Sequence, residues 1–206
     1  MEFFHYLEVT NNSTLIKNMN TELINNLYKI SEDACKAKSN IYGYGIWSHH
    51  IQPMVPIAQR LAKEFGADEE IVTIATLLHD LAGIQNSKDR DRHHIIGAQK
   101  AEEILLTYNY PTNKIESVKF CIINHRSSIN KRKNTIEEVC VADADAIVHM
   151  TEISSLFYAA YIEMKMNIED GKTWIRKKIQ RDWEKMSEQS RSLYKLRFNA
   201  ILEVLK

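Results

Sequence analysis

The chain has 206 residues, 44% of them hydrophobic, and its 27 Lys and Arg residues balance 27 Asp and Glu residues. A chain of this length and composition can bury a sizeable core. Its neutral charge argues against sequence-independent binding to nucleic-acid polymers, which relies on a basic surface. No stretch approaches the roughly 20 apolar residues that a membrane span needs.

Two features bear on the compartment in which the protein works. The N-terminal MEFFHYLEV has no basic region followed by an apolar run, so it does not resemble a secretory signal. Cys35, Cys121 and Cys140 form no CxxC pair and leave an odd count. Together these features predict a reduced, cytoplasmic protein.

Apolar residues recur at helical spacing along the chain, as in Ile71, Ile74 and Leu78, whereas alternating strand patterns are scarce. We therefore expect an all-α fold, a helical bundle with short connections. No linker separates the last quarter of the chain from the rest. The whole chain, residues 1–206, is therefore predicted to form a single helical domain.

The first half of the chain begins with a polar segment of ~20 residues that we expect to be loosely held. A helix is expected over residues 21–36. The Gly43-Tyr-Gly45 stretch is expected to lead into a helix that ends near Gly66, a natural C-terminal stop. Asp68 is a good N-cap for the next helix, which is expected to run through Leu81.

The second half opens on residues 83–92, which have the composition of a polar loop. Helices are expected over residues 93–108, 111–126 and 135–150. Residues 151–206 have apolar positions at helical spacing and are expected to form two or three further helices.

The segment TLLHDLAG places His79 and Asp80 at the end of an otherwise apolar helix face. Burying an imidazole and a carboxylate after Ile74 and Leu78 is costly unless both are paired or coordinate something. A divalent metal would satisfy both groups at once. Taken alone, however, the dipeptide is more simply explained as a capped His-Asp pair on the surface.

Two flanking segments strengthen the metal hypothesis. Upstream, His50 begins a sixteen-residue run to Gly66 with apolar residues at helical spacing. Downstream, in VADADAI, the residues Val141, Asp145 and Val148 share one helical face, so Asp145 is expected to point towards the core. An unpaired carboxylate buried there would be expensive.

A histidine, then His-Asp, then a distant Asp within an apolar helix resembles the pattern of the HD superfamily, over about residues 47–150. The resemblance implies an HD-domain helical bundle with a C-terminal helical extension over about residues 151–206. It also implies that the four corresponding groups converge from separate helices onto one divalent metal. These groups are His50, His79, Asp80 and Asp145.

The pattern leaves alternatives open within this ligand set. His49 stands next to His50, although the register to Gly66 favours His50. Asp143 lies two residues before Asp145, although the resemblance favours Asp145. Prolines near the first ligand add a question of local structure. Because proline suits only the first turn of a helix, that helix is expected either to start near Pro53 or to be broken at Pro56.

Further histidines suggest a second metal. In RHHIIGA, His93 precedes Gly97 by four residues, which resembles the H-x-x-x-G element of HD subfamilies with two metals; His94 is the alternative. His125, in NHR, lies on an apolar helix face. Each is by itself more simply a structural histidine, but together with the HD pattern they predict further ligands. His149, one turn after Asp145, is a candidate for supporting the ligands from outside.

The resemblance implies hydrolysis of a phosphomonoester or phosphodiester, with nucleotides as the usual substrate class. Several imidazoles plus carboxylates suit Mn, Fe, Zn, Ni or Co, as one or two ions. Asp80 is a candidate bridging ligand and catalytic residue. Two alternatives share the fold: an HD-type di-iron oxygenase and a metal-binding HD module without catalysis. For the hydrolase, the expected partner is a small-molecule phosphoester, not a nucleic-acid polymer or a membrane.

A phosphate also needs a cationic partner. Arg126, which directly follows a predicted ligand, is the first candidate for this catalytic role. Arg90, Arg92 and residues 131–133 are weaker candidates. The basic stretch over residues 172–185 is interpreted as an exposed helix face.

Overall fold

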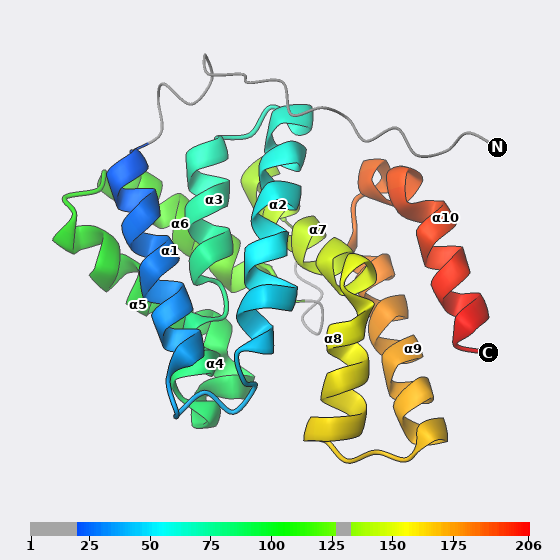
Figure 1. The fold of residues 1–206 in the computed structure, drawn as a ribbon. Coiled ribbons are helices and arrows are strands. Elements are labelled where there is room, and N and C mark those ends of the chain that lie inside the picture. The colour runs from blue at the N-terminus through cyan, green and yellow to red at the C-terminus, as the bar shows by residue number, and fades with distance from the viewer. Residues whose placement is uncertain (1–19, 127–132) are drawn as a thin grey trace.

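The computed structural model describes residues 20–126 and 133–206 (Figure 1). All regular structure in these two ranges is helical, which confirms the all-α prediction. The α-helices are α1 (Thr21–Lys36), α2 (Gln52–Phe65), α3 (Glu69–Leu78), α4 (Leu81–Gln85), α5 (His93–Thr107), α6 (Thr112–Asn124), α7 (Ile136–Thr151), α8 (Ile153–Tyr158), α9 (Ile168–Lys185) and α10 (Glu188–Val204). None of these helices is long and apolar enough to cross a membrane.

Helix ends expected from capping residues are confirmed in the first half of the chain. Helix α1 has the predicted bounds. Helix α2 ends before Gly66, which adopts a left-handed conformation with φ of 74° that glycine tolerates at no steric cost. The Asp68 carboxylate accepts hydrogen bonds from the backbone N–H groups of Glu70 and Ile71, at 3.0 and 3.2 Å, and so begins α3.

The prediction of a polar loop over residues 83–92 is wrong. Helix α4 continues to Gln85, and a 3₁₀-helix, η3, covers Ser87–Arg92. Two local causes are visible: Ile84 is buried in the core, and the Asn86 side chain caps η3 by accepting from the backbone N–H of Lys88. The helix expected through Leu81 also ends earlier, because the chain turns at residues 79–80 between α3 and α4.

Two unusual turns accommodate the prolines near the first predicted ligand. A π-helical turn, η2 (Trp47–Ile51), precedes α2, and the α-helix proper starts at Gln52. Pro53 thus lies in the first turn of α2, where its missing N–H costs no helical hydrogen bond. The helix continues through Pro56 without a break, so only the first of the two expectations is confirmed.

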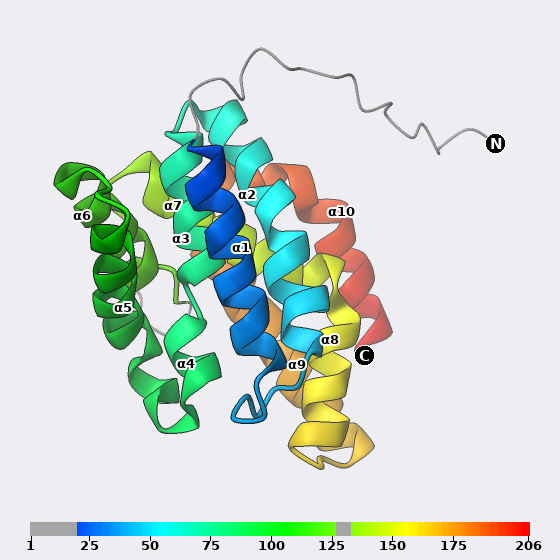
Figure 2. The same cartoon turned by 60° about the vertical axis from the view of Figure 1, so that its left-hand side comes forward.

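Helix α7 lies at the centre of the fold. Most of its residues are buried, and it packs against α2, α3 and α6 on one side and against α9 and α10 on the other (Figures 1 and 2). Helix α5 covers α6, while α1 covers α3 and α4. The C-terminal helices, linked through a second π-helical turn, η4 (Ala159–Glu163), therefore pack directly on the helix that carries the last predicted ligand. The prediction for residues 1–19 lies outside the described residues.

Candidate metal centre

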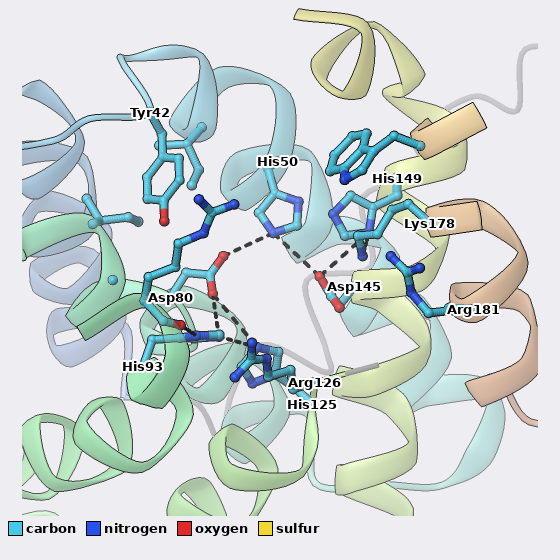
Figure 3. A pocket seen from close by; sticks show the side chains of 15 residues that line it. Tyr42, His50, Asp80, His93, His125, Arg126, Asp145, His149, Lys178 and Arg181 are labelled. Carbon is cyan, nitrogen blue, oxygen red and sulfur yellow. Dashed lines mark hydrogen bonds and ion pairs between the residues drawn. The ribbon is translucent and has the colours of Figure 1, made fainter. Parts of the chain in front are cut away.

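The six predicted metal ligands come from separate parts of the chain and meet at one place. Turns and helix ends supply five of them, where side chains can converge without the constraint of a shared helix face. These five are His50 in η2, His79 and Asp80 between α3 and α4, His93 at the start of α5 and His125 after α6. The sixth, Asp145, lies inside α7. Figure 3 shows all six ligands except His79.

We call the side-chain nitrogen and oxygen atoms that could coordinate a metal the donors, and the first group of them surrounds the Nε2 atom of His50. This atom lies 3.2 Å from Nε2 of His79, 3.5 Å from Oδ2 of Asp80 and 3.5 Å from Oδ1 of Asp145. Nε2 of His79 is in turn 3.3 Å from the same Asp80 oxygen. All four side chains are largely buried, so the donors face one another and not bulk water.

The second group uses the other oxygen of Asp80. Oδ1 of Asp80 lies 3.3 Å from Nε2 of His93 and 3.8 Å from Nε2 of His125, and the two histidine nitrogens are 3.2 Å apart. Asp80 therefore presents one oxygen to each group. This is the geometry that a carboxylate needs to bridge two ions.

Local hydrogen bonds orient three of the imidazoles. Nδ1 of His79, His93 and His125 each donates to the backbone carbonyl three residues earlier, at 2.8, 2.7 and 2.6 Å. Nδ1 thus carries a proton, and Nε2 is turned towards the other candidate ligand atoms. Ring nitrogens and carboxylate oxygens that converge in this way repel one another unless a proton or a metal cation lies between them, so this set of atoms fits a metal.

Charges within the cluster shift the pKa values of its members in opposite directions. Burial favours neutral imidazole at His79, but the Asp80 carboxylate outweighs it and raises the pKa of His79 to about 9. Burial would also raise the pKa of Asp80, yet His79 and His50 hold it well below its usual range. Burial and the charge on His79 together hold the pKa of His125 well below its usual value. Without metal, the pKa values of the neighbouring His79 and His125 are therefore shifted in opposite directions.

The alternative ligands occupy different positions. His49 is exposed and its Nδ1 pairs with Oγ of Ser48 at 2.7 Å. Asp143 accepts hydrogen bonds from the backbone N–H of Ser187, at 3.0 and 3.2 Å, and so holds the N-cap residue of α10. His94 is buried in α5 and belongs to none of the donor groups found among the described residues.

His149 lies beside the first donor group. Its ring stacks on that of His50 with centroids 4.9 Å apart, and its Nδ1 is 4.0 Å from Oδ1 of Asp145. The same nitrogen lies 3.1 Å from Oδ2 of Asp182, a fully buried carboxylate of α9. His149 could thus join His50 and Asp145 in holding an ion, or orient them from outside.

Helix α9 reaches the centre, which corrects the interpretation of residues 172–185 as an exposed face. Nζ of Lys185 donates to Oδ2 of Asp145 at 2.6 Å and to the carbonyl oxygen of His125 at 3.0 Å. Nζ of Lys178 lies 2.9 Å from both oxygens of Asp182. One polar stripe of α9, which includes Asp182 and Lys185, therefore faces the buried Asp145 and His149 of α7.

A cavity of about 370 Å³ opens beside the donors. Of the cations predicted to bind phosphate, Arg126 and Arg90 line it, whereas Arg92 does not. Arg126 donates through Nη1 to the carbonyl oxygen of Asp91, which holds its guanidinium at the cavity wall. Lys133 does not line it either, and residues 131–132 lie outside the described residues.

Comparison with known proteins identifies the family. Residues 47–150 match the HD domain, which is half of the chain, so the chain belongs to the HD domain family. This confirms the resemblance stated above. Family membership and the converging His and Asp groups together support a site for a divalent metal.

Two relatives show how far the similarity extends. The chain is 28% identical over 145 residues to Ribonuclease Y of Rubrobacter xylanophilus, a match that covers 66% of this chain and 24% of that protein. A crystal structure described as a predicted HD superfamily hydrolase, from an uncultured Thermotogales bacterium, superposes with a TM-score of 0.63 at 18% identity. That match covers 95% of each chain, so the shared fold includes the C-terminal helices.

Proposed function

We propose that the protein is a metal-dependent phosphohydrolase that cleaves a phosphomonoester or phosphodiester of a small molecule such as a nucleotide. The observation that carries this proposal is the convergence of six donors in two groups that share Asp80, at the wall of a cation-lined cavity. The similarity to a protein named Ribonuclease Y supports including phosphodiesters among the candidate substrates.

The proposed ligands are His50, His79, Asp80 and Asp145 for a first ion and His93 and His125, with Asp80, for a second. Transition metal ions such as Mn, Fe, Zn, Ni or Co would supply water activation and charge neutralisation at a phosphoryl group. The protein's own part is to fix the donors through carbonyl-bound histidines and to place Arg126 against the phosphate. The Arg126 guanidinium is suited to grip a non-bridging oxygen through two charge-assisted hydrogen bonds.

A screen of metals against phosphoesters tests the proposal. Purified protein supplied with each metal in turn is expected to hydrolyse at least one phosphomonoester or phosphodiester. The cationic lining of the cavity favours an anionic substrate such as a phosphoester. Iron-dependent oxygen uptake without phosphoester turnover would replace the proposal with the oxygenase alternative; no turnover of either kind would leave a non-catalytic module.

The two-ion arrangement predicts a stoichiometry. Wild-type protein at saturating metal is expected to bind two ions per chain, and His125→Ala is expected to bind one, because it removes a donor from the second group only. Elemental analysis after gel filtration measures both. His49→Ala, which removes an exposed imidazole outside the donor groups, serves as the control and should still bind two. A wild-type value that never exceeds one would reject the second site.

Replacing Arg126 is expected to cause a selective loss of catalysis. Arg126→Ala is expected to keep its metal and fold but to lose roughly a hundredfold in phosphoester turnover, the size of effect seen when one electrostatic stabiliser is removed. Arg126→Lys should recover only part, since a single ammonium does not reproduce the guanidinium fork. Arg92→Ala is the matched control, because Arg92 is exposed and lies outside the cavity. Unchanged turnover in Arg126→Ala would remove this residue from the mechanism.

A further inference from the structure

The basic side chains at the cavity come from two opposite walls (Figure 3). Arg126 lies on the side of His93 and His125, and Lys178 and Arg181 lie on the side of Asp145. Neither Lys178 nor Arg181 belongs to the region that matches the HD domain, which ends at residue 150. The second cationic wall is therefore supplied entirely by α9.

The wall on α9 is a regular helical stripe. Trp174, Lys178 and Arg181 all line the cavity, and Lys185 continues the stripe down to the Asp145 carboxylate. These positions are spaced i, i+4, i+7 and i+11, which places them on one face of an α-helix. The side chains that face the cavity are thus set by the register of α9 and not by chance exposure of a basic surface.

The two cations of this wall differ in how they are engaged. Nζ of Lys178 is held by both oxygens of Asp182 at 2.9 Å, which fixes its position but offsets its charge. Arg181 is exposed, and in the described parts of the chain its guanidinium has no hydrogen bond or ion pair. Arg181 therefore retains its full set of donors for a ligand.

Charge balance indicates what kind of ligand this is. Among the described residues that line the cavity, the ionised side chains are four cations and two carboxylates, namely Arg90, Arg126, Lys178, Arg181, Asp80 and Asp145. Both carboxylates face the metal donors, and bound ions would add further positive charge. Asp182 already offsets the charge of Lys178, so one phosphate held by the ions and Arg126 leaves Arg181 without a counter-charge, although the protein as a whole is neutral.

We infer that the substrate carries a second phosphate group, which Arg181, with Lys178 beside it, binds on the α9 wall while the reacting phosphate lies at the metal donors. This inference rests on the proposed phosphohydrolase function and narrows its substrate class to molecules with two or more phosphates. Trp174, on the same stripe, also lines the cavity.

Matched substrates test the inference. For the metal-loaded protein, a nucleoside 5′-diphosphate or 3′,5′-bisphosphate is expected to have a KM about ten- to a hundredfold below that of the 5′-monophosphate, as one or two charge-assisted hydrogen bonds would produce. Arg181→Gln is expected to abolish this preference while leaving monophosphate turnover unchanged, and Arg181→Lys to restore part of it. Arg176→Gln, which removes an equal charge from α9 away from the cavity, should behave as wild type.

A binding measurement separates failure of this inference from failure of the proposed function. Calorimetry at a fixed free metal concentration compares inorganic tripolyphosphate with orthophosphate, and the wild type is expected to bind tripolyphosphate more tightly by an amount that Arg181→Gln removes. Monophosphate turnover without any preference for a second phosphate would overturn the subsite and leave the phosphohydrolase standing. If no phosphoester is cleaved, the proposed function fails, and equal tripolyphosphate binding by wild type and Arg181→Gln would overturn the subsite as well.

Discussion

Asp80→Ala is expected to lose both metal ions and phosphoester turnover together. The two oxygens of Asp80 face different donor groups, at 3.3 Å from Nε2 of His79 and 3.3 Å from Nε2 of His93, and among the described residues only Asp80 belongs to both groups. Loss of a partner outside the ligand set typically costs roughly 10–100-fold in metal affinity. Loss of a shared ligand should exceed that, and metal titration of the variant measures it.

Asp143→Ala is the matched control for this prediction. Its carboxylate is as buried as a ligand but accepts hydrogen bonds from Ser187, the N-cap residue of α10, instead of facing the donors. The variant is expected to keep both ions and to lose about 1 kcal/mol of stability, the usual net value of a hydrogen bond. Retention of two ions by Asp80→Ala, or their loss in Asp143→Ala, would show that the donor groups are wrongly assigned.

Lys185→Met is expected to destabilise the metal-free protein by about 3–5 kcal/mol, because removing one partner of a buried ion pair leaves the other charge uncompensated. The Lys185 side chain is 5% exposed and that of Asp145 is 8% exposed, so water replaces little of the lost interaction. Added metal should recover part of this loss, since a bound cation also neutralises Asp145. Thermal unfolding with and without metal measures both effects.

Lys185 also orients Asp145, since it holds Oδ2 and leaves Oδ1 towards His50. Metal affinity in Lys185→Met is therefore expected to change by roughly 10–100-fold, as for other partners of ligands. Lys185→Arg should restore most of the stability, and Lys177→Met, an exposed lysine of the same helix, should have no effect. Wild-type stability in Lys185→Met would exclude this role.

Burial of a polar group leaves a local signal in the sequence, and this signal predicted part of the candidate site, whereas His50 and His93 were singled out mainly by the resemblance to the HD superfamily. His79 and Asp80 follow an apolar helix face, and the 3.6-residue period places Asp145 towards the core, where the structure finds it. Gly66 and Asp68 likewise carry capping chemistry that acts within a few residues. Each of these inferences needed only neighbours within one or two helical turns.

The contribution of α9 was not predictable in the same way. Lys185 is 40 residues from Asp145 in the chain, and a lysine within a basic amphipathic helix has the same local pattern whether its stripe faces water or a buried carboxylate. The hydrogen bond that Asp143 accepts comes from Ser187, the N-cap residue of α10, which is 44 residues away in the chain. The spacing of Trp174, Lys178 and Arg181 was available in the sequence, but only the packing of α9 on α7 shows which stripe faces inwards.

Elemental analysis of protein purified without chelator, paired with thermal unfolding before and after metal removal, tests the metal centre most directly. The purified protein is expected to carry a divalent transition metal, at up to two ions per chain, and to melt at a lower temperature once the metal is removed, because binding to the folded state stabilises it by mass action. Absence of any transition metal, together with no rise in melting temperature on adding Mn, Fe, Zn, Ni or Co, would contradict the assignment of these His and Asp groups as a metal centre.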